Sequence, residues 1–169
     1  MKNTPRLLAC IAGTWLALAS AGAHAQTGTF QIRVLTPETA LKAVNAALAE
    51  CRKGGYQVAV AVVDRSGLSQ AMLRDRFAGA HTAHVATDKA WTAVSFRSNT
   101  TDLARLTQPG QASSGLRSAD RVMAVGGGVI IEAGGSIVGG IGVSGAPSGD
   151  ADDACAKAGI ASIRDELEL

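Results

Sequence analysis

Residues 57–74 read QVAVAVVDRSGLSQAMLR, and this stretch decides the expected fold. Valines dominate residues 57–63, which is typical of a buried strand. The polar turn Asp64-Arg65-Ser66-Gly67 follows, and residues 68–74 return as a second strand. Because such a short turn reverses the chain, the two strands are predicted to pair antiparallel.

A second strand pair is expected near the other end of the chain. Residues 129–131 and 136–143 are rich in valine, isoleucine and glycine, and the turn Ala133-Gly134-Gly135 separates them. A further strand is compatible with residues 30–35.

Three helices are predicted around these strands. Thr36-Pro37-Glu38 has the features of a helix start, and Gly54-Gly55 ends that helix. Residues 81–96 are rich in alanine, and residues 150 to about 167 begin with acidic side chains. The polar residues 98–120 indicate loops with short helical pieces. Helices must cover the faces of the sheet, so the fold class is α+β, a layered domain with a mainly antiparallel sheet.

The length and the net charge of the chain limit the number of domains and the classes of partner that we expect. A chain of 169 residues indicates one domain. The first 25 residues hold Lys2 and Arg6 without an acid, which leaves 14 basic and 14 acidic residues elsewhere. A neutral body without a basic run argues against nucleic acid as a partner, and against a polybasic membrane anchor.

Residues 1–25 have the features of a signal peptide. A basic start precedes the apolar residues 7–19, and Ala23-His24-Ala25 is a small-x-small cleavage site. We therefore expect cleavage near Ala25 and a single periplasmic or secreted domain of residues 26–169. A retained N-terminal anchor is the alternative.

Export changes the interpretation of the cysteines. Cys51 lies near the end of the first helix and Cys155 near the start of the last. If these helices pack antiparallel, a disulfide closes a loop of about 100 residues and stabilises the fold by about 4 kcal/mol. Two unpaired buried thiols are the alternative.

Three glycine motifs fail as cofactor or catalytic signatures. Residues 140–145 match G-x-G-x-x-G but lack a following βαβ unit. Residues 142–146 have Ala146 where a nucleophile elbow needs glycine, and residues 126–128 lack a phosphate-loop lysine. The loop at residues 145–149 precedes a helix N-terminus, which can hold an anion, although an ordinary capped helix explains it equally.

The second helix carries the candidate ligand residues. Four of its residues share one face within about 80°: His81, His84, Asp88 and Trp91. The opposite, core-facing stripe is small and apolar: Ala83, Ala86, Ala90, Ala93 and Val94. Imidazole binds haem iron and other transition metals, and an aromatic ring stacks on a flat macrocycle. A solvated helix end is the alternative.

The last helix carries two adjacent acid pairs. Neighbours in sequence do not face each other on a helix. Asp152-Asp153 and Asp165-Glu166 are therefore predicted to be surface charge.

Six short motifs in order resemble the GlcG/HbpS family of small haem-binding-type proteins, from about Leu35 to Ile163. They are D-x-x-G at residues 64–67 followed by Arg74, G-A at 79–80, K-A-x-T-A at 89–93, the glycines at 126–128, I-G-V-S-G at 141–145 and A-x-A-G at 156–159. Two positions depart from the family pattern: Ala78 replaces an aspartate, and Ile130 replaces a proline.

The resemblance implies a profilin-like α/β/α domain that forms a homo-oligomer. It implies haem or another tetrapyrrole as ligand for some members, and redox sensing with a membrane sensor protein for some exported ones. It does not imply catalysis.

We therefore predict an exported haem-binding protein. His81 and His84 are the candidate iron ligands, with His81 preferred. Trp91 is expected to stack on the ligand, and Arg74 is expected to bind a propionate.

Two alternatives stay open. An enzyme or accessory protein for a small carboxylic acid such as glycolate would use Arg74 and the loop at Gly145. An interaction protein would need no small ligand.

Overall fold

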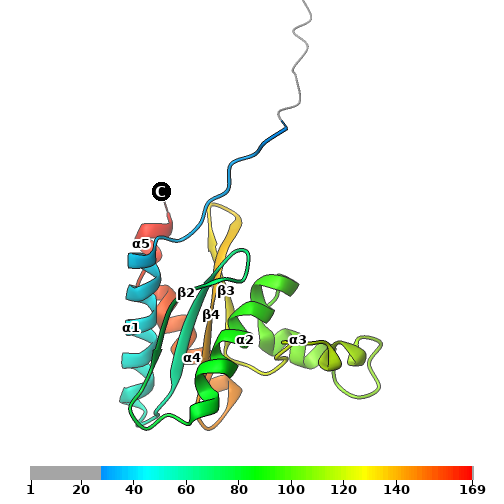
Figure 1. Ribbon diagram of the computed structural model, residues 1–169. Coiled ribbons are helices and arrows are strands. Elements are labelled where there is room, and N and C mark those ends of the chain that lie inside the picture. Colours follow the sequence, from blue (N-terminus) through cyan, green and yellow to red (C-terminus); the bar gives the residue numbers. More distant parts are fainter. Residues whose placement is uncertain (1–27, 169) are drawn as a thin grey trace, which may run out of the picture. The chain divides into compact units, whose positions relative to one another are not determined.

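Four strands form one antiparallel sheet in the order β2-β1-β4-β3 (Figure 1). The central strands are β1 (Ala59–Asp64) and β4 (Ser136–Ser144). The edge strands are β2 (Ser69–Arg74) and β3 (Gly128–Ala133). The predicted hairpins and the antiparallel sheet are thereby confirmed.

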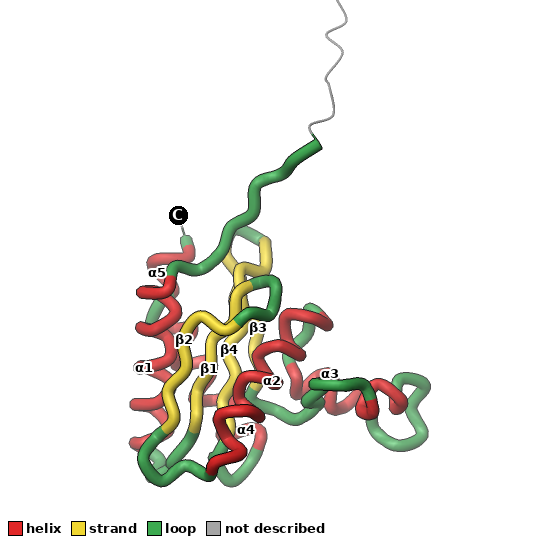
Figure 2. The backbone as a smooth tube through the Cα atoms, viewed as in Figure 1, coloured by secondary structure: helices red, strands yellow, loops and turns green. Residues whose placement is uncertain are grey.

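Helices cover both faces of the sheet, so the domain is α+β with α/β/α layers. The helices α1 (Pro37–Lys53) and α4 (Gly149–Ala161) pack together on one face, and α2 (Ala80–Phe96) covers the other (Figures 1 and 2). The alternation of β1 explains the layers: Val58, Val60 and Val62 join the core under α1 and α4, whereas Ala59 and Ala61 contact α2.

The small side chains on α2 and β4 bring the helix close to the sheet. A Cβ placed on Gly142 would collide with the backbone of Ala86 and Ala90, and one on Gly140 would collide with Val94. The predicted apolar stripe of α2 does face the sheet: Ala86, Ala90, Ala93 and Val94 are buried, and Ala83 is half-buried. Glycine on β4 is thus a packing requirement.

The predicted Thr36 cap of α1 is confirmed, and Ser148 caps α4. Thr36 Oγ1 accepts a hydrogen bond from the Thr39 amide at 3.2 Å, and Ser148 Oγ accepts one from Ala151 at the same distance. The helix α2 ends at Arg97, which adopts a left-handed conformation with φ 52°.

Two of the expected elements differ from the structure, and the short helical pieces expected in residues 98–120 are confirmed. Residues 30–35 form no strand. The last helix divides into α4 and α5 (Arg164–Leu167), because the chain bends at Ser162 and Ile163 enters the core. Residues 98–120 hold α3 (Thr100–Leu106) and the 3-10 helix η1 (Ser114–Ser118).

The computed structural model describes residues 28–168. One compact unit is Ile32–Leu169, and Met1–Gln31 is a separate unit. The predicted signal peptide and its cleavage site lie outside the described residues. Across 28–168, no helix has the length and apolarity needed to cross a membrane.

Candidate functional site

The outward face of α2 carries a chain of charged contacts centred on Asp88. His84 Nε2 lies 2.9 Å from Asp88 Oδ2, and Arg121 Nε donates to Asp88 Oδ1 at 3.1 Å. His84 is largely exposed, but the Asp88 side chain is only 4% exposed. Asp88 is therefore not on the open surface, contrary to the expectation for that face, because Arg121 covers it.

Trp91 extends this face. The Arg121 guanidinium lies over its ring, 4.7 Å from the centroid, which is a cation–π distance. The Cδ1–Nε1 edge of the indole reaches the β1–β2 turn, where a Cβ on Gly67 would collide with it. Gly67, at φ +82°, thus gives the turn its shape and leaves room for the indole.

His81 lies exposed in the first turn of α2. Its ring packs against Gly79, because a Cβ there would lie 2.7 Å from His81 Cε1. No hydrogen bond or ion pair to His81 is present among the described residues. Its imidazole nitrogens are therefore available to a ligand.

Arg74 and Gly145 do not join the cluster of His84, Asp88, Arg121 and Trp91. Arg74 Nη1 donates to the Ala78 carbonyl in the loop before α2. Gly145 adopts φ +128° and approaches Gln57 and Val58 closely.

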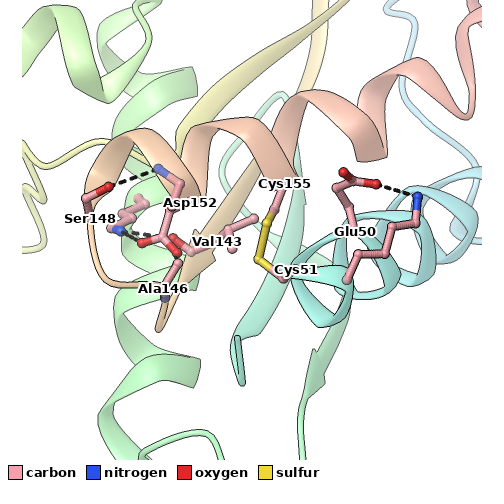
Figure 3. The surroundings of a disulfide bond; sticks show 10 residues. Glu50, Cys51, Val143, Ala146, Ser148, Asp152 and Cys155 are labelled. Atoms are coloured by element: carbon pink, nitrogen blue, oxygen red, sulfur yellow. Dashed lines mark hydrogen bonds and ion pairs between the residues drawn. A yellow bond between two sulfur atoms is a disulfide. The ribbon is translucent and has the colours of Figure 1, made fainter. Parts of the chain in front are cut away.

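The predicted anion position in the loop after Gly145 already holds a carboxylate of this chain. Asp152 Oδ1 accepts the Ala146 amide at 3.0 Å (Figure 3). Ser148 caps the same helix, so the local geometry is that of a self-capped helix start.

The prediction that Asp152 and Asp153 are surface charge is wrong. Lys89 Nζ donates to Asp152 Oδ2 at 2.8 Å and to the Val143 carbonyl at 2.9 Å, and all of these groups are buried. Burial raises the pKa of Asp152 above its usual value, and the hydrogen bond from Lys89 opposes that rise. The remaining acid pair, Asp165 and Glu166, is exposed as predicted.

Asp153 is buried by separate contacts. Thr101 Oγ1 donates to it at 2.6 Å, and so does the Gly127 amide at the same distance. It thereby ties α4 to α3 and to the start of β3.

Two of these residues were missed by sequence reasoning. Arg121 lies 33 positions after Asp88, in a segment without periodicity, so no local signal pointed to it. Lys89 did carry a signal, because it falls beside Ala86, Ala90 and Ala93 on the buried stripe. A charge at such a position requires a buried partner.

The disulfide prediction is confirmed. Cys51 at the end of α1 is bonded to Cys155 in α4, with the Cα atoms 5.5 Å apart and a sequence separation of 104 (Figure 3). Both residues lie in the core between the two helices and the sheet. The bond therefore closes most of the domain into one covalent loop.

The larger of the described hollows lie away from α2, and a smaller one, about 220 Å³, lies at its C-terminal end beside Val94 and Ser95. The largest of those described, about 570 Å³, is lined by residues 32–36, Thr39, Ala133, Val138 and residues 166–167, without a histidine. Another, about 410 Å³, lies between α3 and the start of α4. The outward face of α2 is thus an open platform, which could contact only one side of a flat ligand.

The donor set on this platform fits a tetrapyrrole. An exposed imidazole can bind iron, and a guanidinium can bind a carboxylate. The indole expected to stack on the ligand already has the Arg121 guanidinium over its ring. Within residues 28–168, no three histidine, cysteine or acidic side chains converge as they would around a bare metal ion. A haem iron could be held by a single side chain.

The comparisons with known proteins agree on one family. The family model described as haem degrading protein HbpS-like matches residues 35–161. A double mutant of HbpS from Streptomyces reticuli is 42% identical, with a TM-score of 0.74 over 85% of this chain and 97% of that one. A PduOC–heme complex is 32% identical, with a TM-score of 0.73 over 77% and 95% of the two chains.

One relative is much longer. The corrinoid adenosyltransferase PduO of Salmonella typhimurium is 36% identical over 108 residues, which are 63% of this chain but 32% of that protein. The match therefore spans about a third of the adenosyltransferase. The adenosyltransferase activity is a property of that whole protein, and it is not assigned to the matched third.

Proposed function

Since the chain belongs to the HbpS-like family, we propose that it binds haem or a related tetrapyrrole on the outward face of α2. One observation carries the proposal: exposed His81 and His84 share this face with Trp91 and a guanidinium. The similarity to a protein solved as a heme complex supports the same ligand class.

The two histidines have different roles in this proposal. His84 is held by Asp88, whereas His81 has no such partner among the described residues. His81 is therefore assigned as the iron ligand. His84 stands beside it and supplies polar contacts to the same ligand.

The α2 platform covers only one side of a flat ligand, and this favours a homo-oligomer. A second copy of the chain would cover the other side and exclude water from the iron. Haem would supply the redox and gas-binding chemistry, and the chain's own residues would orient the ring and hold its carboxylates.

We further propose that the domain works outside the cytoplasm after removal of residues 1–25. There it would store haem or report its presence to a membrane sensor protein. The Cys51–Cys155 disulfide supports an oxidising compartment.

A haemin titration of the oxidised exported protein, followed by the Soret band, tests the proposal. Wild type is expected to give a saturable, shifted band, and the His81→Ala, His84→Ala double variant is expected to lose it. Gln108→Ala, at an exposed position just after α3, is the control and should bind like wild type. Saturable binding by the double variant would place the ligand elsewhere, and no binding by wild type would refute a haem function.

A further inference from the structure

Arg121 occupies an unusual backbone position beside the α2 platform. Its φ is 63°, in the left-handed region that side chains other than glycine rarely adopt. Contacts with Thr92 hold it there: Thr92 Oγ1 lies 3.3 Å from the Arg121 carbonyl and accepts the Met123 amide at 2.9 Å. Local strain of this kind persists where the surroundings fix a side chain in place.

Only part of the Arg121 guanidinium makes contacts within the described residues. Its Nε donates to Asp88, and its flat face lies on Trp91. Nη1 and Nη2 make no hydrogen bond within residues 28–168, and 40% of the side chain is exposed.

Another arginine of this chain binds a carboxylate through two guanidinium nitrogens. Arg52 donates through Nε at 2.7 Å and through Nη2 at 2.9 Å, to the two oxygens of Asp75. Asp88 does not accept two hydrogen bonds from Arg121 in this way, because the second carboxylate oxygen of Asp88 is paired with His84. A planar edge of Arg121 therefore remains for another carboxylate.

We propose that Arg121 is the carboxylate-binding residue of the α2 platform, and that Asp88 and Trp91 are positioning residues that hold its guanidinium. The carboxylate is either a haem propionate, in which case this inference rests on the proposed function, or a free small carboxylic acid. The sequence analysis assigns this role to Arg74, but Arg121 is preferred here because Asp88 and Trp91 orient its guanidinium, whereas the contact described for the Arg74 guanidinium is one hydrogen bond from Nη1 to the Ala78 carbonyl.

The spacing along α2 agrees with this assignment. His81 and Asp88 are seven residues apart, which is about 10 Å along a helix axis. Iron at His81 and a carboxylate at Arg121 could therefore belong to one haem. Since Asp88 already neutralises part of the guanidinium charge, the specificity comes from the N–H donors of Nη1 and Nη2 more than from net charge.

The test compares haemin with haemin dimethyl ester, in which the propionates carry no charge. Wild type is expected to bind the diacid about tenfold more tightly, the value of a charge-assisted hydrogen bond. Arg121→Gln should abolish this preference, and Arg121→Lys should keep part of it. Arg105→Gln, which removes an exposed arginine on α3, is the control and should keep the full preference.

Thermal unfolding of each variant shows that it is folded before the preference is interpreted. If Arg121→Gln keeps the preference for the diacid, or if Arg74→Gln loses it, the assignment of Arg121 is overturned. Both results can occur while haem binding itself stands.

Small acids separate the two carboxylate sources. If wild type binds neither porphyrin, the proposed haem function fails, and acetate and glycolate are then tested by thermal shift. Stabilisation of wild type but not of Arg121→Gln supports the site with a free acid as ligand. Equal response of the two proteins overturns the inference.

Discussion

Lys89 and Asp152 form an ion pair that is nearly sealed from solvent, with side chains 3% and 5% exposed. Asp152→Leu would leave a buried ammonium without its counter-charge. We expect the free energy of unfolding to fall by about 3 kcal/mol, measured by urea denaturation.

The matched control removes both charges. Lys89→Met with Asp152→Leu should be more stable than Asp152→Leu alone, because no unpaired charge remains. If the single variant unfolds like wild type, the pair does not contribute as described.

Asp75 gives a prediction about pH. The hydrogen bonds from the Arg52 guanidinium lower the pKa of Asp75 to about 2, from 3.8. Because the folded pKa lies below the unfolded one, the stabilisation is present above pH 4 and is lost between about pH 4 and pH 2. Asp75→Asn should therefore be less stable than wild type at pH 7, and the difference should shrink as pH falls through this window.

Acid unfolding followed by circular dichroism measures this difference. Glu50→Gln, in an exposed pair with Lys53, should show little effect at any pH. A gap between Asp75→Asn and wild type that stays constant from pH 7 to pH 2 would contradict the mechanism.

At the scale of the element, α2 depends on glycine in β4. Gly142→Ala would push its methyl group into the backbone of α2 at Ala86 and Ala90. Backbone cannot yield as a side chain tip can, so we expect a loss of about 3 kcal/mol in the free energy of unfolding. The affinity for haemin, measured by the Soret titration, should also fall, because α2 would shift.

Gly115→Ala is the control for this substitution. A Cβ at Gly115 meets nothing within 4 Å. The free energy of unfolding of Gly115→Ala should therefore stay within about 0.5 kcal/mol of the wild-type value. Equal effects of the two substitutions would mean that close packing of α2 is unimportant.

The sequence determined more about the inward face of α2 than about its outward face. The alanine stripe follows helical periodicity, and it is buried as predicted. Asp88 belongs to the outward face by the same periodicity, yet Arg121 from a distant loop covers it. Periodicity describes one helix, and it carries no information on which loop will pack against it.

At the scale of the molecule, the Cys51–Cys155 disulfide joins α1 to α4 across 104 residues. Closing a loop of this length restricts the unfolded chain, and the expected contribution to stability is about 4 kcal/mol. Cys51→Ala with Cys155→Ala should therefore unfold at markedly lower denaturant concentration.

Dithiothreitol provides the matched comparison. It should destabilise wild type toward the double variant and leave the double variant unchanged. If the reduced and oxidised wild-type proteins unfold at the same denaturant concentration, the disulfide does not stabilise the domain.

The sequence by itself determined the hairpins, the three main helices, the small-residue packing of α2 and the cysteine pair. These features depend on turns, caps and periodicity, which act over a few residues, or on the pairing of two cysteines. The tertiary structure alone decided that Asp152 and Asp153 are buried, that Arg74 is bonded to its own loop, and that Arg121 lies on Trp91. Each of these contacts depends on which distant segment covers a side chain, and that is settled only when the layers pack.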